Sequence, residues 1–273
     1  MGADPKKMDF ESKNDLIAYL NLIIELTIKH FNRYKEYYRE LLDLAAEQTG
    51  KLAGVEKEKI TEDNFQEIIK KCLKTDEFRN HHEKLKYKYL EYKSVEDRIG
   101  NVQNQILNLL GDRTSKGGVS YWRFRDEYRK MKKKQPDLPA LAEFSDEFNG
   151  TLNDFYRTRN YSHHMTDAKF MEWKKYREEE LKQAGHKLFQ VWPSETITIA
   201  RYDYVSIEWI WQLLLAHIAF KSSVEEVLTQ MKKDYSVLYG KSIRIETKWM
   251  DTLGVSAFEI SLNGFERHLG KIK

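Results

Sequence analysis

Apolar residues recur every three or four positions along most of this chain, the spacing that places them on one face of an α-helix. The first such segment follows Ser12 and Asp15, which form a capping-box pattern, and it ends near Gly50. A shorter segment follows Thr61 and carries Cys72 in its apolar stripe, so we interpret this cysteine as a packing residue. The pattern therefore predicts two helices in this part of the chain.

The helical pattern continues through the middle of the chain. A long helix is expected over residues 76–110, either kinked near Gly100 or serving as the spine of a bundle, and Gly111 fits its C-terminal cap. A short basic helix is expected over residues 121–134. A further helix is expected over residues 137–159, with a proline in its first turn.

The remaining third mixes helical and extended signals. Helices are expected over residues 167–184, 206–220 and 222–238, and β-branched alternation makes residues 187–202 a strand or an extended crossover. Weak alternation over residues 241–262 leaves a hairpin open as an alternative. The predicted fold class is therefore all-α, a multi-helix bundle that allows a small β-hairpin near the C-terminus.

Composition agrees with a helical domain. Only 4 prolines and 13 glycines occur in 273 residues, which favours long helices over short strands and turns. We find no internal repeat and no proline-rich linker. We expect a single domain over residues 1–273, with a helical core over about 10–185 and a C-terminal helical subregion over 186–273.

Charge and hydropathy limit where the protein is expected to reside and which partners it is expected to have. The chain is 33% charged, its mean hydropathy is −0.71, and it has no apolar run of the roughly 18–20 residues that a membrane span needs. One cysteine and the lack of an apolar signal segment at the start lead us to expect a soluble cytoplasmic protein without a membrane partner. The net charge of +3 is too small for general polyanion binding, so any such contact must be local.

Several classes of enzyme lack their signatures here. The chain has no GxGxxG motif, no phosphate-binding loop ending in Gly-Lys-Ser/Thr and no GxSxG motif. Its 8 histidines form neither HExxH nor the Glu-x-x-His pairs of a di-iron bundle, so we expect no metal and no cofactor. His217 lies on an apolar helix face, where a hydrogen-bonded core histidine is favoured over a ligand.

A charged residue interrupts one apolar stripe. The stripe of the helix expected over 137–159 would continue at position 159, where an arginine stands. The chain continues as Arg159-Asn160-Tyr161-Ser162-His163-His164. This segment resembles the Arg-Asn-x-x-x-His signature of the HEPN superfamily (higher eukaryote and prokaryote nucleotide-binding), whose members are helical. The resemblance covers about residues 76–185, an extension to the first helix stays open, and the C-terminal region does not align.

The resemblance implies a HEPN-like core and a protein that processes or binds nucleic acid, most directly a metal-independent endoribonuclease. Arg159 would hold the phosphate, and His164 would act as base or acid. Asn160 would orient the turn or the substrate, and His163 or Arg157 would substitute in a looser register of the motif. Because ribonucleases of this family commonly line one cleft with residues of two protomers, the resemblance also implies a homodimer that acts on RNA or a nucleotide.

The basic helix expected over residues 121–134 offers a second contact for nucleic acid. Helical spacing places Arg125, Arg129 and Lys132 on one face, which suits a phosphate backbone. Trp122 would stack on a base. In the alternative interpretation this face is only solvated, and the aromatic side chains belong to the core.

Three functions therefore remain open. The first is a metal-independent endoribonuclease of HEPN type. The second is a helical module that binds nucleotides or RNA without cleaving them. In the third, a helical protein-interaction scaffold, the motif is accidental: Arg159 and Asn160 only end a helix, and the two histidines are exposed loop residues.

Overall fold

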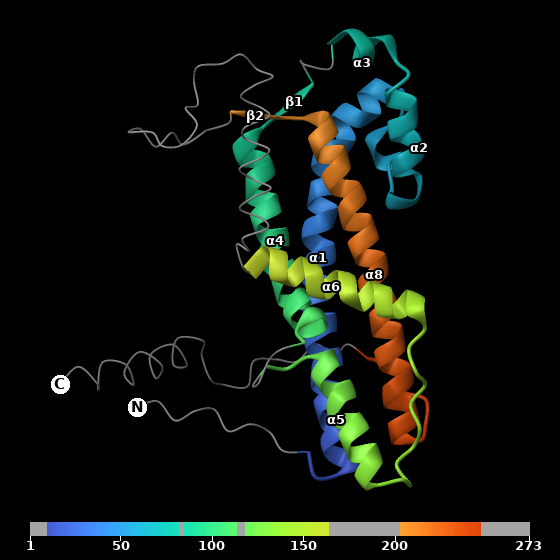
Figure 1. Ribbon diagram of the computed structural model, residues 1–273. Coiled ribbons are helices and arrows are strands. Elements are labelled where there is room, and N and C mark those ends of the chain that lie inside the picture. Colours follow the sequence, from blue (N-terminus) through green and yellow to red (C-terminus); the bar gives the residue numbers. More distant parts are fainter. Residues whose placement is uncertain (1–9, 82–84, 114–117, 164–202, 247–273) are drawn as a thin grey trace, which may run out of the picture. The chain divides into compact units, whose positions relative to one another are not determined.

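The computed structural model describes residues 10–81, 85–113, 118–163 and 203–246. These residues are mostly helical and contain one small antiparallel sheet (Figure 1), which confirms the predicted fold class. The elements are α1 (Lys13–Ala53), η1 (Lys57–Lys59), α2 (Glu62–Cys72), α3 (Asp76–His81), β1 (Lys86–Lys88), α4 (Tyr89–Gly111), α5 (Tyr121–Lys134), α6 (Asp146–His163), β2 (Tyr204–Ser206) and α8 (Ile207–Tyr239). Among the described residues, no helix combines the length and apolar character that a membrane span requires.

The chain divides into two compact units, residues 1–241 and 242–273, and all the elements given above belong to the first. The predicted boundary near residue 185 lies outside the described residues and stays a prediction. The helix α8, expected in a C-terminal subregion, packs along α1 within the first unit.

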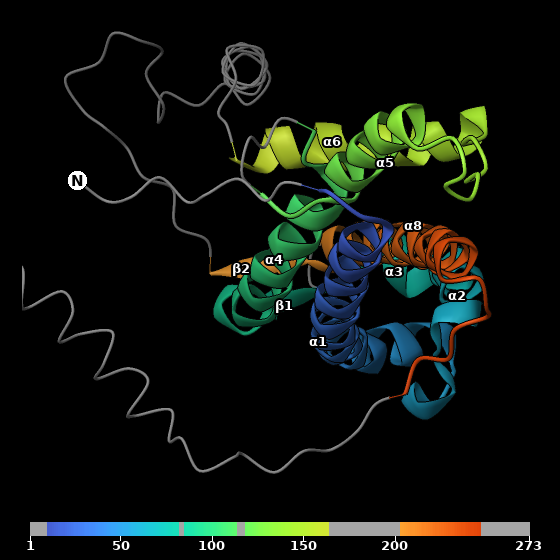
Figure 2. The same cartoon turned by 90° about the horizontal axis from the view of Figure 1, so that it is seen from below.

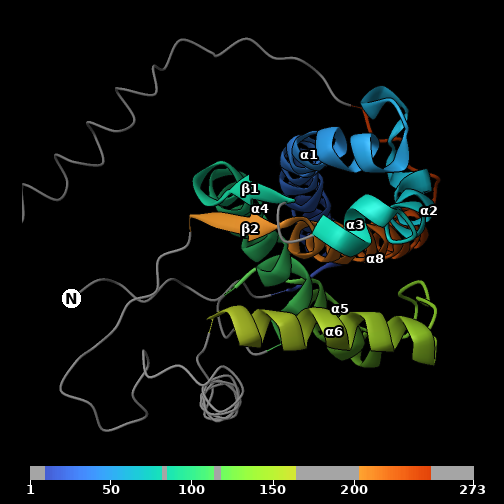
Figure 3. The same cartoon turned by 90° about the horizontal axis from the view of Figure 1, so that it is seen from above.

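Three long helices, α1, α4 and α8, form the centre of the first unit. α1 packs against both α4 and α8. Figures 2 and 3 show α6 on the side of α4 and α8 that faces away from α1, where it crosses both helices. A nearly continuous set of buried apolar side chains fills the space between these layers. The layered arrangement brings the C-terminal half of α6 against the end of α4.

The predicted starts of the first two helices are confirmed. The Asp15 N–H donates to Ser12 Oγ at 3.3 Å, and the Ser12 N–H donates to Asp15 Oδ2 at 2.8 Å, which completes a capping box. The Thr61 N–H donates to Asn64 Oδ1 at 2.9 Å at the start of α2. Cys72 is fully buried at the end of α2, as expected of a packing residue, and burial raises the pKa of its thiol to about 11.

The long helix expected over residues 76–110 is wrong in its first part. α3 ends at His81, and β1 pairs with β2 so that Tyr87 lies opposite Val205. Tyr87 is buried and its Oη donates to the Ala45 carbonyl at 3.0 Å. These long-range contacts override the local helical preference, so α4 begins only at Tyr89.

The helix expected from residue 137 begins later, at Asp146. The preceding segment is held in a non-helical conformation by side chains of α5. Tyr128 Oη donates to the Pro139 carbonyl at 3.0 Å and accepts from the Leu141 N–H at 2.9 Å. Because these groups satisfy its backbone, the segment does not need helical hydrogen bonds. Ser145 Oγ then accepts from the Phe148 N–H at 3.2 Å at the start of α6.

The two helices expected over 206–220 and 222–238 form one continuous helix, α8. The helix predicted to restart at Ser222 does not begin there, and the Oγ of the neighbouring Ser223 donates to the Ala219 carbonyl at 3.1 Å inside α8. The elements expected over 167–184 and 187–202 lie outside the described residues. The same holds for the hairpin alternative beyond residue 246, while 241–246 contain no strand.

Gly111 has a role that differs from the predicted helix cap. It is the last residue of α4, and the described glycines with positive φ are Gly54 and Gly240. A Cβ at position 111 would lie 2.5 Å from the Phe155 carbonyl oxygen of α6. Only glycine therefore allows the two backbones to approach this closely.

His217 is the histidine that lies buried in the core among the described residues. His217 of α8 is 5% exposed, and a hydrogen bond of 2.7 Å joins its Nδ1 to Tyr34 Oη of α1. Its Nε2 is buried without a hydrogen-bond partner among the described residues. Burial lowers the pKa of His217 to about 4, so the neutral form is retained at neutral pH. The expectation of a hydrogen-bonded core histidine is confirmed.

We predict that Gly111→Ala lowers the free energy of unfolding by about 1–3 kcal/mol, because the added methyl group forces α4 and α6 apart. Gly100→Ala in the same helix is the matched control, since a Cβ there meets nothing within 4 Å. That variant should gain about 0.5–1 kcal/mol from helix propensity. Urea denaturation measures both, and equal stability of the two variants would contradict the role assigned to Gly111.

We predict that stability falls as the pH drops from 6.5 towards 4 because of His217. In this range the unfolded state binds a proton at His217 and the folded state does not. The free energy of unfolding therefore falls by about 3 kcal/mol in total. Because His217→Gln has no imidazole to protonate, its free energy of unfolding should fall less steeply with decreasing pH than that of the wild type. The measurement is urea denaturation at several pH values. Parallel curves for the two proteins would assign the acid sensitivity to other groups.

Candidate nucleic-acid interface

Arg159 occupies the position at which the apolar stripe of α6 breaks. Phe148, Leu152 and Phe155 of this stripe are buried against the other helices. The Arg159 side chain, one turn further on, is 17% exposed. The stripe therefore ends on a cation that lies at the edge of the core and is reachable by solvent.

Among the described residues, Asn108, Asp112 and Asn160 contact the Arg159 guanidinium. Its Nε donates to Asn108 Oδ1 at 3.2 Å, and its Nη2 lies 3.4 Å from Asp112 Oδ2. Its Nη1 donates to Asn160 Oδ1 at 3.4 Å. The Asp112 side chain is only 10% exposed, so this pair is screened less than a surface pair. Asn108 and Asp112, at the end of α4, hold the guanidinium in place.

A second arginine lies next to this group. Arg113 directly follows Asp112, and its guanidinium carbon is 3.8 Å from the centre of the Trp122 ring and 4.9 Å from that of Tyr156. Arg113 Nη2 also donates to Asn153 Oδ1. Stacking of a guanidinium on aromatic rings fixes its plane and leaves its edge for hydrogen bonds.

We call these residues together the arginine cluster; its members are Asn108, Asp112, Arg113, Trp122, Asn153, Tyr156, Arg159 and Asn160. They come from the end of α4, the start of α5 and the part of α6 from Asn153 onwards. The contact of Gly111 with Phe155 brings the first and third of these segments together. The cluster contains two cations and one carboxylate, so it carries net positive charge.

The other residues of the motif are placed as follows. Arg157 is 78% exposed and pairs weakly with Asp154 at 3.9 Å, away from the Arg159 face of α6. His163 is the last residue of α6, but its side chain lies outside the description, as does all of His164. The expectation that an Arg159 site includes a histidine therefore stays a prediction.

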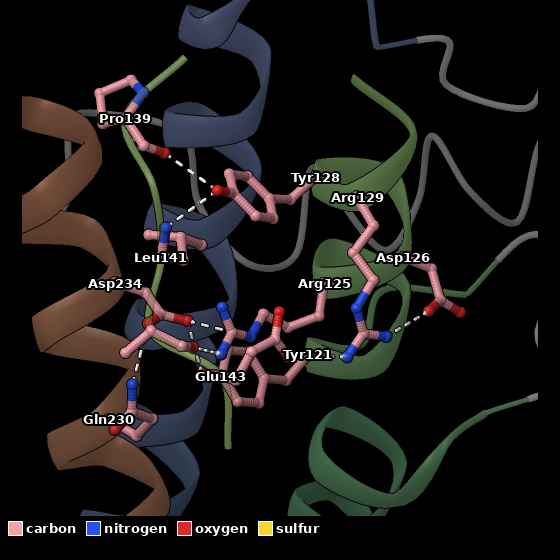
Figure 4. A network of polar contacts seen from close by, with 11 residues as sticks. Tyr121, Arg125, Asp126, Tyr128, Arg129, Pro139, Leu141, Glu143, Gln230 and Asp234 are labelled. Atoms are coloured by element: carbon pink, nitrogen blue, oxygen red, sulfur yellow. Dashed lines mark hydrogen bonds and ion pairs between the residues drawn. The ribbon is translucent and has the colours of Figure 1, made fainter. Parts of the chain in front are cut away.

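The basic face predicted for α5 is wrong at Arg125. This side chain is 5% exposed, lies 3.5 Å from Asp234 Oδ2, and donates to the Ala142 carbonyl at 2.6 Å (Figure 4). Its guanidinium carbon is also 3.8 Å from the centre of the Phe144 ring. Position 125 belongs to the buried face of α5, so Arg125 cannot contact a phosphate backbone in the folded chain.

Asp234 is the centre of the buried network that holds Arg125. Tyr121 Oη donates to its Oδ2 at 2.7 Å, and Gln230 Nε2 donates to its Oδ1 at 2.9 Å. Burial raises the pKa of Asp234, while Arg125 and these two hydrogen bonds oppose the rise. The network joins α5, α8 and the segment before α6, so its role is structural.

The remaining basic residues of α5 are divided among different partners. Arg129 is 48% exposed and lies 3.3 Å from Asp126. Lys132 Nζ donates to the carbonyls of Pro136 and Leu138, after the end of the helix. Trp122 is half-buried, and the Arg113 guanidinium covers its ring. Of the nucleic-acid contacts predicted on α5, Arg129 is the cation that stays openly exposed.

A hollow of about 400 Å³ lies between the start of α6 and α8, at the end of α6 opposite Arg159. Its lining includes Glu143, Phe148, Glu226 and Gln230. The lining carries two carboxylates, Glu143 and Glu226, and one cation, Lys233, so its net charge disfavours a polyanion. Among the described residues, no group of three or more His, Cys, Asp or Glu side chains could hold a metal ion.

Sequence patterns identified Arg159 but missed most of its partners. Asn108, Asp112 and Arg113 belong to a helix end and a loop with no motif of their own. Their proximity to α6 depends on a contact between residues far apart along the chain, Gly111 and Phe155. The spacing of residues within one segment cannot predict such a contact.

Comparisons with protein-family models, with curated proteins and with solved structures found no match for this chain. The arginine cluster therefore has to be interpreted from its own geometry.

We predict that Arg125→Ala lowers the free energy of unfolding by about 3–5 kcal/mol, because it leaves Asp234 buried without its cation. Arg129→Ala, on the same helix and half exposed, is the matched control and should change stability by less than about 0.5 kcal/mol. Thermal and urea denaturation measure both. If Arg125→Ala were as mild as Arg129→Ala, the buried network would not stabilise the fold as described.

Proposed function

We propose that this chain binds RNA at the arginine cluster and cleaves it without a metal ion. The observation that carries the proposal is the Arg159 guanidinium, which Asn108, Asp112 and Asn160 orient at the edge of the core. Four residues later the chain has two consecutive histidines, His163 and His164. This order of residues is the basis of the HEPN resemblance.

The chemistry requires one cation and two groups that exchange protons near neutral pH. One histidine takes the proton from a 2′-hydroxyl, and the 2′-oxygen then attacks the adjacent phosphorus. The bond from phosphorus to the 5′-oxygen breaks, and that oxygen receives a proton from a second histidine. The products are a 2′,3′-cyclic phosphate and a 5′-hydroxyl. Arg159 stabilises the charge that develops on the phosphate oxygens.

Arg113 adds a second cation for the RNA backbone. Its guanidinium lies over the rings of Trp122 and Tyr156 and donates to Asn153 Oδ1. Held in this way, it loses little conformational freedom when a phosphate binds. Two oriented arginines on adjacent elements support binding to a phosphate backbone better than the dispersed cations of α5 do.

A homodimer belongs to the same proposal, because two protomers would supply two histidines of opposite role. It rests on the family resemblance. The strongly apolar face of α8 does not add to it, since Ile207, Ile210 and Leu214 are already buried within the single chain.

A second candidate function is RNA binding without cleavage. It is favoured by Asp112, whose carboxylate lies 3.4 Å from the Arg159 guanidinium and partly neutralises it. Under this alternative, Arg159 organises the site and Arg113 contacts the phosphate. Binding of RNA without the formation of cyclic-phosphate products would support the second candidate over the first.

We predict that the wild-type chain cleaves single-stranded RNA in the presence of EDTA. Arg159→Ala should lower the rate by about 10²–10³-fold because charge stabilisation is removed, and His164→Ala by about 10²–10⁴-fold because proton transfer is removed. The measurement is the appearance of 2′,3′-cyclic-phosphate ends in labelled RNA. Arg39→Ala, an exposed arginine on α1, is the control and should cleave at the wild-type rate.

Arg159→Lys separates charge from geometry, since it keeps the cation but not the planar fork that grips two oxygens. It should retain more activity than Arg159→Ala and remain well below the wild type. Melting temperatures identify any variant that fails to fold. Full cleavage by folded Arg159→Ala, or a wild-type chain inert towards RNA in EDTA, would contradict the ribonuclease proposal.

A further inference from the structure

The exposed face of α4 has an unusual composition. Residues 99–111 contain no charged side chain, in a chain that is 33% charged. The outer positions of this stretch carry amides instead. Asn101, Gln105 and Asn108 are exposed, and Asn104 is half-buried. We call these four residues the amide face.

The four amides share one side of the helix and continue into the arginine cluster. Their spacing of three, four and seven residues places them on adjacent turns. Asn108 is the member that accepts from Arg159 Nε. The side chains of Asn101, Asn104 and Gln105 form no hydrogen bond within the described part of the chain. Asn101 and Gln105 are exposed, so their donors and acceptors are open to solvent.

Helix stability does not account for these residues. Asparagine is less favourable than alanine, lysine or glutamate in the interior of a helix. Asn101 is exposed and has no hydrogen-bond partner among the described side chains, so no packing or pairing within the fold offsets this effect. A residue that disfavours its own helix, and makes no contact that offsets this cost, is expected where a surface has a function.

We propose that the amide face contacts the bases of the single-stranded RNA whose phosphates bind the arginine cluster, and that it favours adenine. The inference rests on the proposed RNA binding. An amide side chain presents a carbonyl acceptor beside an NH₂ donor. Unpaired adenine presents the complementary pair on two edges, the N6 amino donor beside N7 and beside N1, whereas uracil and cytosine present a donor beside an acceptor on one edge only. One amide can therefore make two hydrogen bonds to adenine from either edge.

The same features fit other occupants of this face less well. A face without cations adds nothing to non-specific attraction of phosphates, so its contribution is directional hydrogen bonding. The centres of protein interfaces are rich in aromatic side chains and methionine, which the amide face lacks. Unpaired bases, in contrast, expose edges that polar side chains can reach.

The test uses short oligo(A), oligo(C) and oligo(U) of equal length with 2′-O-methyl groups, which block the nucleophile and prevent cleavage. Fluorescence anisotropy in EDTA gives the affinities at several salt concentrations. The test variant is Asn101→Ala/Gln105→Ala, which leaves Asn108 and the arginines intact. The control is Asn21→Ala/Asn32→Ala, two exposed amides on one face of α1.

We expect the wild type to bind oligo(A) about tenfold more tightly than oligo(U), the effect of one good pair of hydrogen bonds to a base. The test variant should lose this preference, with little change for oligo(U). Its salt dependence should equal that of the wild type, because no charge is removed. The control variant should behave as the wild type, and all proteins should melt at similar temperatures.

Two failures can be told apart. If the wild type binds none of the oligonucleotides, the proposed function fails and this inference fails with it. If the wild type binds them all but the test variant keeps the same preference, the inference is overturned while RNA binding stands. A test variant that changes only its sedimentation would identify the face as an interface between copies and would also overturn the inference.

Discussion

The contact between the backbones of α4 and α6 at Gly111 determines where the arginine cluster lies. A Cβ at this position would come within 2.5 Å of the Phe155 carbonyl, so the crossing requires glycine. Once the helices cross there, Arg159, one turn after Phe155, reaches Asn108 and Asp112 at the end of α4. The orientation of the Arg159 guanidinium by α4 and the contact of Arg113 with Tyr156 both depend on this one close approach.

The chain uses its arginines in two different ways. Arg125 is enclosed by Asp234, the Ala142 carbonyl and the Phe144 ring, so its charge is fully committed to joining α5 to its neighbours. Arg113 and Arg159 are oriented by similar partners, a carboxylate, amides and aromatic rings, but at the edge of the core. Burial therefore distinguishes Arg125, whose side chain is 5% exposed, from Arg159, whose side chain is 17% exposed.

The sequence pattern predicted the bounds of an element correctly where interactions within that segment determine them. The capping box at Ser12 and the bounds of α5 are confirmed because hydrogen bonds and periodicity within one segment determine them. The start of α4 and that of α6 were wrong because Tyr87 and Tyr128 bind distant backbone groups. At the site, the break in an apolar stripe identified Arg159. Its partners on α4 and the burial of Arg125 depend on contacts between segments, which periodicity does not encode.

The claim that the arginine cluster binds a phosphate backbone is tested most directly by the salt dependence of RNA affinity. The variant Arg113→Gln/Arg159→Gln keeps polar side chains at both positions and removes the two cations. The account predicts that the slope of log affinity against log salt concentration becomes shallower by about 1.4, since each single-strand phosphate that an arginine neutralises adds about 0.7 to the slope. A folded variant with the same slope as the wild type would contradict the account.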